Sequence, residues 1–209
     1  MSHNLRSHTS NLSLIVQLID NVDTVEEKLE MIDNIKDISE SLNSTIEHLN
    51  EVVTIQTQTH DNKVDVKFNN IIGLVKKAIN RIIRETNSTI ITDFSQVSSI
   101  PYIPAYMESI LLNLITNAIK YKHPDRAPII NVKTYSQDNN TFLEVSDNGI
   151  GIDLDKFGNK LFGMYKTFHY NKDAVGIGLF ITKNQIESLN GQISVESTVN
   201  KGTTFKIQF

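Results

Sequence analysis

The sequence contains no cysteine, which excludes disulfide bonds and metal sites built from thiolates. It also contains no tryptophan, and only four of its 209 residues are proline. No apolar run approaches the ~18 residues that a membrane-spanning helix requires, and no secretory signal peptide is present. We therefore expect no membrane contact within this chain.

Clusters of like charge are missing as well. The chain has 20 basic and 24 acidic residues, a formal net charge of −4, and neither kind forms a run or a patch. Because nucleic-acid-binding domains usually carry a concentrated basic surface, no binding to nucleic acid is expected. The six histidines are scattered without the spacing of metal ligands. With 39% hydrophobic residues, the composition is that of an ordinary soluble protein.

Residues 3–58 contain neither glycine nor proline, and their apolar residues recur with helical spacing. The pattern predicts two helices separated by a break at residues 20–24, where Asp23 or Thr24 would cap the second helix. The apolar stripe of the first helix consists of Leu5, Leu12, Ile15 and Ile19. The stripe of the second alternates spacings of four and three and consists of Met31, Ile35, Ile38, Leu42, Ile46, Leu49 and Val53.

A hairpin of two such helices has too little core to be stable alone. Pairing with a second copy into a dimeric four-helix bundle would bury both stripes. We therefore expect residues 1–60 to form a dimerisation domain. The alternative is a helical hairpin that packs on the domain that follows it.

From residue 61 onward the pattern changes to alternating strands and helices. Eight of the nine glycines lie at or after Gly149, so backbone freedom is concentrated in this part. The expected elements are a strand at 64–68, a helix at 71–85, a strand at 89–94, a helix at 105–121, a hairpin of strands 129–135 and 141–146, a helix ending near 190, and a hairpin of strands 192–197 and 203–209. Mixed hairpins and helices predict an α+β fold, an α/β two-layer sandwich, for residues 61–209.

The helix expected at residues 105–121 carries a polar set beside its apolar residues. Asn113, Asn117 and Lys120 share one face of this helix, and Tyr121 neighbours it. An amide oxygen suits Mg²⁺, which prefers oxygen ligands, while a lysine attracts phosphate and a tyrosine ring can cover a base. Taken alone, this set would equally be the polar face of an ordinary helix.

Two segments rich in glycine follow. Residues 147–152 read Asp-Asn-Gly-Ile-Gly-Ile directly after a strand; the glycines let the backbone approach a ligand, and the carboxylate can accept a hydrogen bond from an exocyclic amine. Residues 176–179 read Gly-Ile-Gly-Leu and open a helix, whose free N–H groups suit a polyphosphate. Each segment alone is weak evidence, since the first is most often a simple turn.

In order and spacing, residues 64–209 resemble the ATP-binding domain shared by histidine kinases, gyrase, Hsp90 and MutL. The asparagine-bearing helix, the first glycine segment, a lid and the second glycine segment follow one another as in that family. Gly-Thr-Thr-Phe at residues 202–205 also resembles the terminus of the kinases. The lid is expected at residues 153–175 and carries Phe162, Tyr165, Phe168 and His169. The resemblance implies that the domain binds ATP and Mg²⁺.

The resemblance also implies a role for individual residues. Asn117 is expected to be the Mg²⁺ ligand, with Asn113 beside it, and Lys120 is expected to meet phosphate. The other expected nucleotide contacts are Tyr121 and Asp147 at adenine, Gly149 and Gly151 in the base pocket, Phe162 in the lid, Gly176, Gly178 and Leu179 at the phosphates, and Thr204 near the terminus. The kinases usually have a glycine where this chain has Ala174.

Residues 3–8, His-Asn-Leu-Arg-Ser-His, resemble the histidine box of dimerising kinase helices. Two residues depart from it, because Asn4 replaces an acidic residue and His8 replaces proline. His8 falls within the apolar arc of the first helix, whereas His3 lies nearly opposite it, so His3 is the better phosphoacceptor. Ser7 stands where the family often has a residue that aids phosphatase activity. The alternative is that His3 is simply an exposed terminal histidine.

The resemblance thus implies a cytoplasmic protein histidine kinase, alone or as part of a larger sensor protein. It would act as a homodimer that autophosphorylates on His3 and passes the phosphoryl group to an aspartate of a response regulator. One alternative is an ATPase of the same superfamily; such ATPases place a glutamate four residues before the metal-binding asparagine, where this chain has Asn113. The other is a degenerate kinase that acts as a dimeric ATP-binding scaffold, with only Asn4 and Ala174 in its favour.

Overall fold

The computed structural model describes residues 13–19, 22, 24–39, 63–163 and 177–209. The chain divides into two compact units, Met1–Thr54 and Ile55–Phe209.

In the first unit, residues 13–19 and 25–39 are helical. Thr24 caps the second helix, since its Oγ1 accepts a hydrogen bond from the backbone N–H of Glu27 (3.3 Å) and its hydroxyl donates to the Glu27 carboxylate (2.6 Å). Asp23, the other candidate cap, lies outside the described residues. The members of the predicted stripe that the structure describes are each partly buried, namely Ile15, Ile19, Met31, Ile35 and Ile38.

A second set of apolar side chains in this unit faces outward. These side chains are between 42% and 69% exposed and belong to Leu14, Val16, Leu18, Val25, Leu29 and Ile32. Scattered exposed apolar side chains are normal on protein surfaces, but here Leu14 and Leu18 share one face of the first helix, and Val25, Leu29 and Ile32 share one face of the second.

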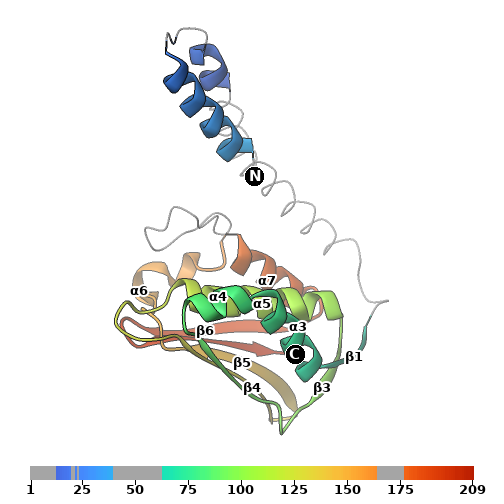
Figure 1. Ribbon diagram of the computed structural model, residues 1–209. Coiled ribbons are helices and arrows are strands. Elements are labelled where there is room, and N and C mark those ends of the chain that lie inside the picture. The colour runs from blue at the N-terminus through green and yellow to red at the C-terminus, as the bar shows by residue number, and fades with distance from the viewer. Residues whose placement is uncertain (1–12, 20–21, 23, 40–62, 164–176) are drawn as a thin grey trace. The chain divides into compact units, whose positions relative to one another are not determined.

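The second unit is an α+β domain in which helices lie on one face of a sheet (Figure 1). Its helices are α3 (Phe68–Ala78), α4 (Asn80–Glu85), α5 (Pro104–Lys120), α6 (Leu154–Phe157) and α7 (Gly178–Glu187), with a 3₁₀ turn at Gly158–Lys160. Its strands are β1 (Val64–Lys67), β2 (Thr89–Asp93), β3 (Ser99–Tyr102), β4 (Ile129–Gln137), β5 (Asn140–Asp147), β6 (Gln192–Thr198) and β7 (Gly202–Gln208). The five-stranded sheet has the order β2-β4-β5-β7-β6, and β1 pairs with β3 beside it.

The sheet is mixed. The pair β2–β4 is parallel and the other pairs are antiparallel. Both predicted hairpins turn where residues accept a positive φ: Asp138 and Asn139 (51° and 63°) between β4 and β5, and Asn200 (65°) between β6 and β7. Because β7 pairs with β5 in the antiparallel sense, the last residues of β5 lie beside the first residues of β7.

Two expectations about this unit were wrong. The single helix expected at residues 71–85 is two helices, α3 and α4, because Ile79 departs from helical geometry (φ −102°, ψ 16°). The strand β3 was not expected at all. It is only four residues long and contains Pro101, which lacks an N–H group and is usually a sign against a strand.

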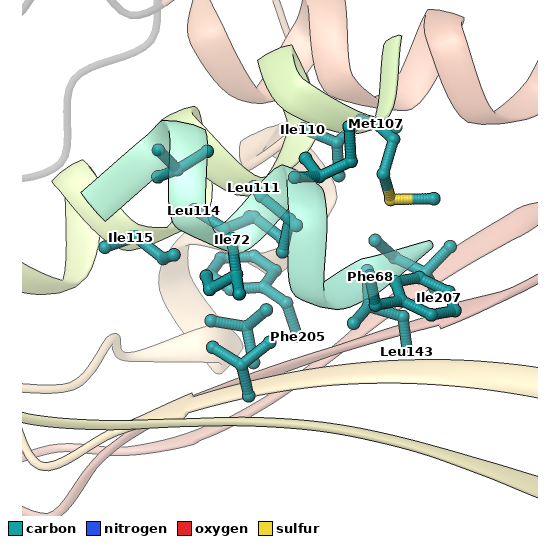
Figure 2. Packing of buried hydrophobic residues seen from close by; sticks show 14 of the residues in the cluster. Phe68, Ile72, Met107, Ile110, Leu111, Leu114, Ile115, Leu143, Phe205 and Ile207 are labelled. Carbon is teal, nitrogen blue, oxygen red and sulfur yellow. The ribbon is translucent and has the colours of Figure 1, made fainter. Parts of the chain in front are cut away.

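The core lies between the helices and the sheet (Figure 2). The helix α5 contributes many side chains to this core. Its buried positions recur at alternating spacings of three and one, which places them on one face of the helix. Its fully buried side chains are those of Met107, Ile110, Leu111, Leu114 and Ile115. Burying an apolar side chain of this size contributes roughly 1.5–3 kcal/mol, so α5 is held firmly in place. The polar residues on the remaining face of α5 are therefore presented from a rigid support.

Candidate functional site

The polar face of α5 is organised by a short chain of hydrogen bonds. Asn117 Nδ2 donates to Asn113 Oδ1 (3.2 Å), and Asn113 Nδ2 donates to Thr182 Oγ1 on α7 (2.7 Å). Thr182 is almost fully buried, with 1% of its surface exposed. The chain fixes which way both amides point, and it leaves the carbonyl oxygen of Asn117 available to a ligand. Thr182 was not anticipated from the sequence, where it is one polar residue among many.

The close contact between α5 and α7 depends on Gly178, the first residue of α7. A Cβ atom at Gly178 would collide with the side chain of Asn113. A further bond between the helices joins Gln185 Nε2 to Ser109 Oγ (3.0 Å). The free N–H groups at the start of α7 therefore lie next to the asparagine face of α5, as expected for a phosphate site.

Asp147 ends β5 and is half-buried. Its Oδ1 accepts hydrogen bonds from the backbone N–H groups of Gly149 (2.7 Å) and Thr203 (3.3 Å). Burial raises the pKa of Asp147, while these two N–H groups and the charge of Arg126 act in the opposite direction. Within the described part of the chain no donor is recorded for Oδ2. A carboxylate held by one oxygen in this way can receive an amine through the other.

Three glycines around Asp147 are required by the backbone. A Cβ at Gly149 would lie 2.5 Å from the carbonyl oxygen of Tyr121. Gly151 and Gly202 have positive φ values (69° and 132°), and a Cβ at either would collide with a neighbouring carbonyl oxygen, that of Thr198 or that of Asp147. These glycines allow close packing between the end of α5, the segment after β5 and the turn between β6 and β7, which lie around the Asp147 carboxylate.

Tyr121 follows the last residue of α5 and links it to the first glycine segment. Its carbonyl oxygen accepts a hydrogen bond from the N–H of Ile150 (3.0 Å). Its ring is partly buried, which raises the pKa of its hydroxyl, and the Lys120 Nζ lies 6.0 Å from the ring centroid. Lys120 itself is exposed.

Thr203 contacts the Asp147 carboxylate through its backbone N–H group. The nucleotide contact expected in this motif was its neighbour, Thr204. Thr203 is buried and its hydroxyl bonds to Ser197 Oγ (2.9 Å), whereas Thr204 is only partly buried and pairs in the sheet with Ser146 and Glu196. Nothing in the pattern of this motif shows which threonine lies by the carboxylate, and the role of Thr204 stays a prediction.

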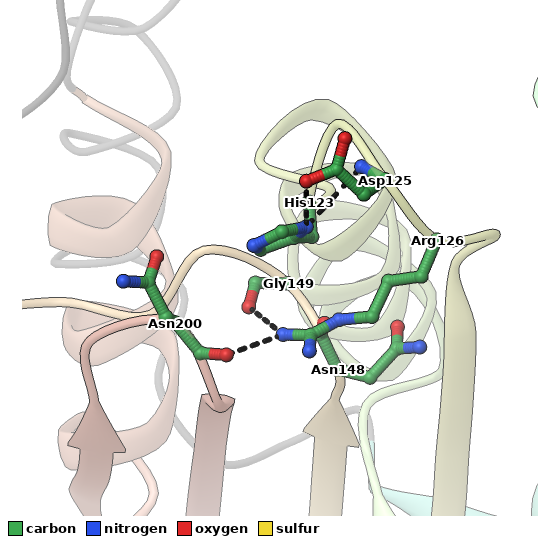
Figure 3. A network of polar contacts seen from close by, with 6 residues as sticks. All are labelled: His123, Asp125, Arg126, Asn148, Gly149 and Asn200. Atoms are coloured by element: carbon green, nitrogen blue, oxygen red, sulfur yellow. Dashed lines mark hydrogen bonds and ion pairs between the residues drawn. The ribbon is translucent and has the colours of Figure 1, made fainter.

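Arg126 is a second residue that sequence reasoning missed. It lies between α5 and β4 and donates hydrogen bonds to the backbone carbonyls of Asn148, Gly149 and Asn200 (Figure 3). No motif marks it, because its partners are backbone atoms that are distant in the sequence.

The structure does not describe every expected site residue. Phe162 and Leu179 are partly buried and pack against the core, and the Lys183 Nζ lies 5.7 Å from the centroid of the Phe162 ring. The lid expected at residues 153–175 begins with α6 and a 3₁₀ turn. The expected positions that lie outside the described residues are His3, Asn4, Ser7, His8, Tyr165, Phe168, His169, Ala174 and Gly176.

Among the residues that the structure describes, no three acidic or histidine side chains are grouped so that they could hold a metal ion. The candidate donor for a hard cation is the amide oxygen of Asn117, which fits a metal that takes its other ligands from phosphate and water. No described helix is both long and apolar enough to cross a membrane.

A protein-family model described as "Histidine kinase-, DNA gyrase B-, and HSP90-like ATPase" matches residues 103–209, just over half of the chain. The match includes α5, both glycine segments and β7. It therefore covers every residue of the α5–α7 and Asp147 clusters described above.

Two relatives carry names of signalling proteins. The sensor protein RprX of Bacteroides fragilis is 32% identical over 105 residues, which cover 49% of this chain and 20% of that protein. The signal transduction histidine-protein kinase ArlS of Staphylococcus aureus is 28% identical over 197 residues, which cover 82% of this chain and 41% of that protein. The chain thus spans less than half the length of either relative.

Solved structures share the fold. The histidine kinase AdeS of Acinetobacter baumannii has a TM-score of 0.70 at 22% identity, covering 99% of this chain and 96% of that one. ShkA, solved with AMPPNP, has a TM-score of 0.68 at 18% identity, covering 99% of this chain and 44% of that one. At these identities the likeness shows the fold alone, and it agrees with the expected α+β class.

Proposed function

This chain belongs to the family of histidine kinase-, DNA gyrase B- and HSP90-like ATPases, and on that premise we propose that it is the ATP-binding and phosphoacceptor part of a protein histidine kinase. Its relatives RprX and ArlS, named as a sensor protein and a histidine-protein kinase, support this choice within the family. The substrate is ATP and the acceptor is a histidine of the chain.

Asp147 recognises the adenine. Its Oδ1 is occupied by the N–H groups of Gly149 and Thr203, so Oδ2 accepts a hydrogen bond from the exocyclic amine. Tyr121 packs against the base from the end of α5. The glycines at 149 and 151 allow the backbone to lie close enough for this contact.

Asn117 holds the metal at the phosphates. Mg²⁺ bound there would neutralise negative charge on the triphosphate, which is its main contribution to phosphoryl transfer. Asn113 and Thr182 keep the Asn117 oxygen directed outward through their hydrogen bonds. Lys120 and the N-terminus of α7 add positive potential for the phosphates.

Asn113 is the observation that carries the choice of a kinase over an ATPase. An amide has no basic oxygen with a useful pKa, so it cannot activate water as a glutamate would. Both atoms of its amide are also engaged, Oδ1 by Asn117 and Nδ2 by Thr182. Without a base beside the γ-phosphate, water is a poor acceptor and a histidine of the protein is favoured.

The acceptor is His3. An imidazole nitrogen of His3 attacks the γ-phosphorus, an N–P bond forms, the bond from phosphorus to the β,γ-bridging oxygen breaks, and ADP leaves. The ring proton is lost to solvent, because Asn4 cannot take it as an acidic neighbour would. The phosphoryl group then passes to an aspartate of a response regulator. Ser7 comes four residues after His3 in the sequence and is the candidate for assisting removal of the phosphoryl group.

The N-terminal helices form the homodimer. The six exposed apolar side chains of residues 14–32 support this arrangement, because a second copy of the same hairpin would cover them in a four-helix bundle.

Incubation with γ-labelled ATP and Mg²⁺ tests the proposal. A kinase gives label on the protein that is lost in acid and retained in base, and His3→Gln removes the label while His8→Gln retains it. Released labelled phosphate without protein label would instead indicate an ATPase, and neither product would indicate a scaffold. Loss of label in His8→Gln alone, in a folded protein, would show that the acceptor is His8.

A further inference from the structure

Arg126 joins three parts of the second unit through one guanidinium group. Its Nε donates to the carbonyl of Asn148 (2.6 Å), and its Nη2 donates to the carbonyls of Gly149 (3.0 Å) and Asn200 (2.7 Å). Asn148 and Gly149 belong to the segment after β5, whereas Asn200 lies in the turn between β6 and β7. Figure 3 shows the three carbonyls converging on the guanidinium.

The side chain of Asn148 reinforces this junction. Its Oδ1 accepts a hydrogen bond from the N–H of Ile129 (2.9 Å), and its Nδ2 donates to the carbonyl of Ala127 (3.0 Å). The loop that carries Arg126 is therefore tied to the segment after β5 by bonds in both directions. A planar guanidinium can serve several carbonyls at fixed angles, whereas the single ammonium group of lysine cannot reproduce that geometry.

The bonds of Arg126 end on the supports of Asp147. The N–H of Gly149 donates to Asp147 Oδ1, so the residue whose carbonyl Arg126 holds is also the one that holds the carboxylate. Asn200 lies two residues before Gly202, and Gly202 packs against the Asp147 carbonyl. The N–H of Asn200 donates a hydrogen bond to the Ile150 carbonyl (2.7 Å). Movement of either support would rotate the carboxylate.

We propose that Arg126 is a positioning residue for base recognition, which directs the free oxygen of Asp147 at the exocyclic amine and so makes the site prefer adenine to purines without that amine. The inference rests on the proposed nucleotide site. Arg126 does not contact the base itself; it acts through the Gly149 and Asn200 carbonyls.

Arg126 also acts on Asp147 by charge. Of the charged side chains that the structure describes, it is the one whose charge lowers the pKa of this carboxyl, against burial, which raises it. A substitution that removes the charge therefore raises the pKa of Asp147 further. A substitution by lysine keeps the charge while losing the geometry, so the two effects can be separated.

The test compares the wild type with Arg126→Lys and Arg126→Gln by calorimetric titration with ATP and with inosine triphosphate, which carries a carbonyl oxygen in place of the amine. Both variants should lose roughly tenfold in ATP affinity, as expected when charge-assisted hydrogen bonds are lost, with little change for inosine triphosphate. In addition, the acid limb of ATP binding should move to higher pH in Arg126→Gln and stay near the wild-type position in Arg126→Lys. Arg81→Gln is the control, because Arg81 pairs only with Glu85 on the exposed side of α4.

An equal loss of both nucleotides, or an unchanged ratio between them, would overturn the inference, since a merely structural arginine weakens both. Arg126→Lys decides the question if Arg126→Gln fails to fold in a thermal melt. Wild-type protein that binds neither nucleotide would instead contradict the proposed nucleotide site itself.

Discussion

The two oxygens of Asp147 are in different environments, and this difference separates recognition from stability. In Asp147→Asn the amide oxygen can replace Oδ1 toward Gly149 and Thr203, which leaves an N–H group where the base amine would bind. Two donors then face each other. We expect the variant to fold and to lose at least roughly tenfold in ATP affinity, measured by titration calorimetry.

The same substitution changes the pH dependence of stability. Burial raises the pKa of Asp147 in the folded, nucleotide-free domain above its ordinary value of 3.8. The folded state therefore binds more protons than the unfolded state as pH rises from 3.8 to the raised value, and the free energy of unfolding falls across that window. In thermal melts, Asp147→Asn should gain melting temperature relative to wild type as pH rises through this window. A constant difference at all pH values would contradict the burial argument.

Asn117 is the proposed Mg²⁺ ligand. Asn117→Ala removes the only amide oxygen of the α5 face that is left for a cation, and we expect it to abolish Mg²⁺-dependent labelling while preserving the fold. Asn131→Ala, on an exposed position of β4, is the matched control and should label as wild type does. Normal labelling of a folded Asn117→Ala protein would contradict the proposed Mg²⁺ site.

Thr182 is connected to the proposed Mg²⁺ ligand Asn117 through Asn113. Thr182→Val keeps the shape of the buried side chain but leaves Asn113 Nδ2 without its acceptor, so the Asn117 oxygen loses its fixed direction. In Thr182→Val we expect the Mg²⁺ concentration for half-maximal labelling to rise several-fold, while the ratio of the affinities for ATP and inosine triphosphate stays unchanged. Thr182→Ser should restore the wild-type Mg²⁺ concentration. If valine and serine variants both behave like wild type, the amide chain does not orient Asn117.

At this scale, the sequence predicts site residues that carry a recognisable motif and misses those that act through the fold. The spacing of Asn113 and Asn117 is enough to place them on one helix face, which the structure confirms. The roles of Thr182 and Arg126 depend on hydrogen-bond partners that are distant in the sequence. The partner of Thr182 is 69 positions away, and those of Arg126 are 22 or more positions away. No local pattern contains such information.

At the scale of elements, the contact between α5 and α7 depends on an absent side chain. In Gly178→Ala the new Cβ would meet Asn113, so the two helices must separate or Asn113 must move. We expect a loss of roughly 1–3 kcal/mol in the free energy of unfolding, measured with urea, together with weaker labelling. Gly73→Ala is the control: no atom lies within 4 Å of its Cβ position inside α3, so it should stabilise by about 0.5–1 kcal/mol.

Most elements could be predicted because their own residues determine them. The helix α5 has a wide apolar face and a proline at its start, and both hairpins have Asn or Asp where a positive φ is needed. The break at Ile79 and the strand β3 depend instead on tertiary contacts. β3 exists because Ser99–Tyr102 pair with β1, some 35 residues earlier in the chain.

At the scale of the whole molecule, the proposed dimer would form through the exposed apolar side chains of the N-terminal helices. Leu29→Glu with Ile32→Glu places two charges among these side chains, and we expect sedimentation analysis to show a monomer where the wild type is a dimer. Val199→Glu, at an exposed apolar position of the second unit, should leave the dimer intact. A dimer that survives the double substitution would place the interface elsewhere.

The position of β7 within the sheet bears on how the domain is made. β7 comes last in chain order among the described strands of this domain, yet it pairs with both β5 and β6 and supplies the Thr203 N–H that holds Asp147. Until it emerges, β6 has no partner and the carboxylate lacks half its support. The growing chain therefore cannot hold the Asp147 carboxylate in its final place before β7 has been synthesised. Once β7 is in place, nucleotide in the cell would favour the finished fold by mass action.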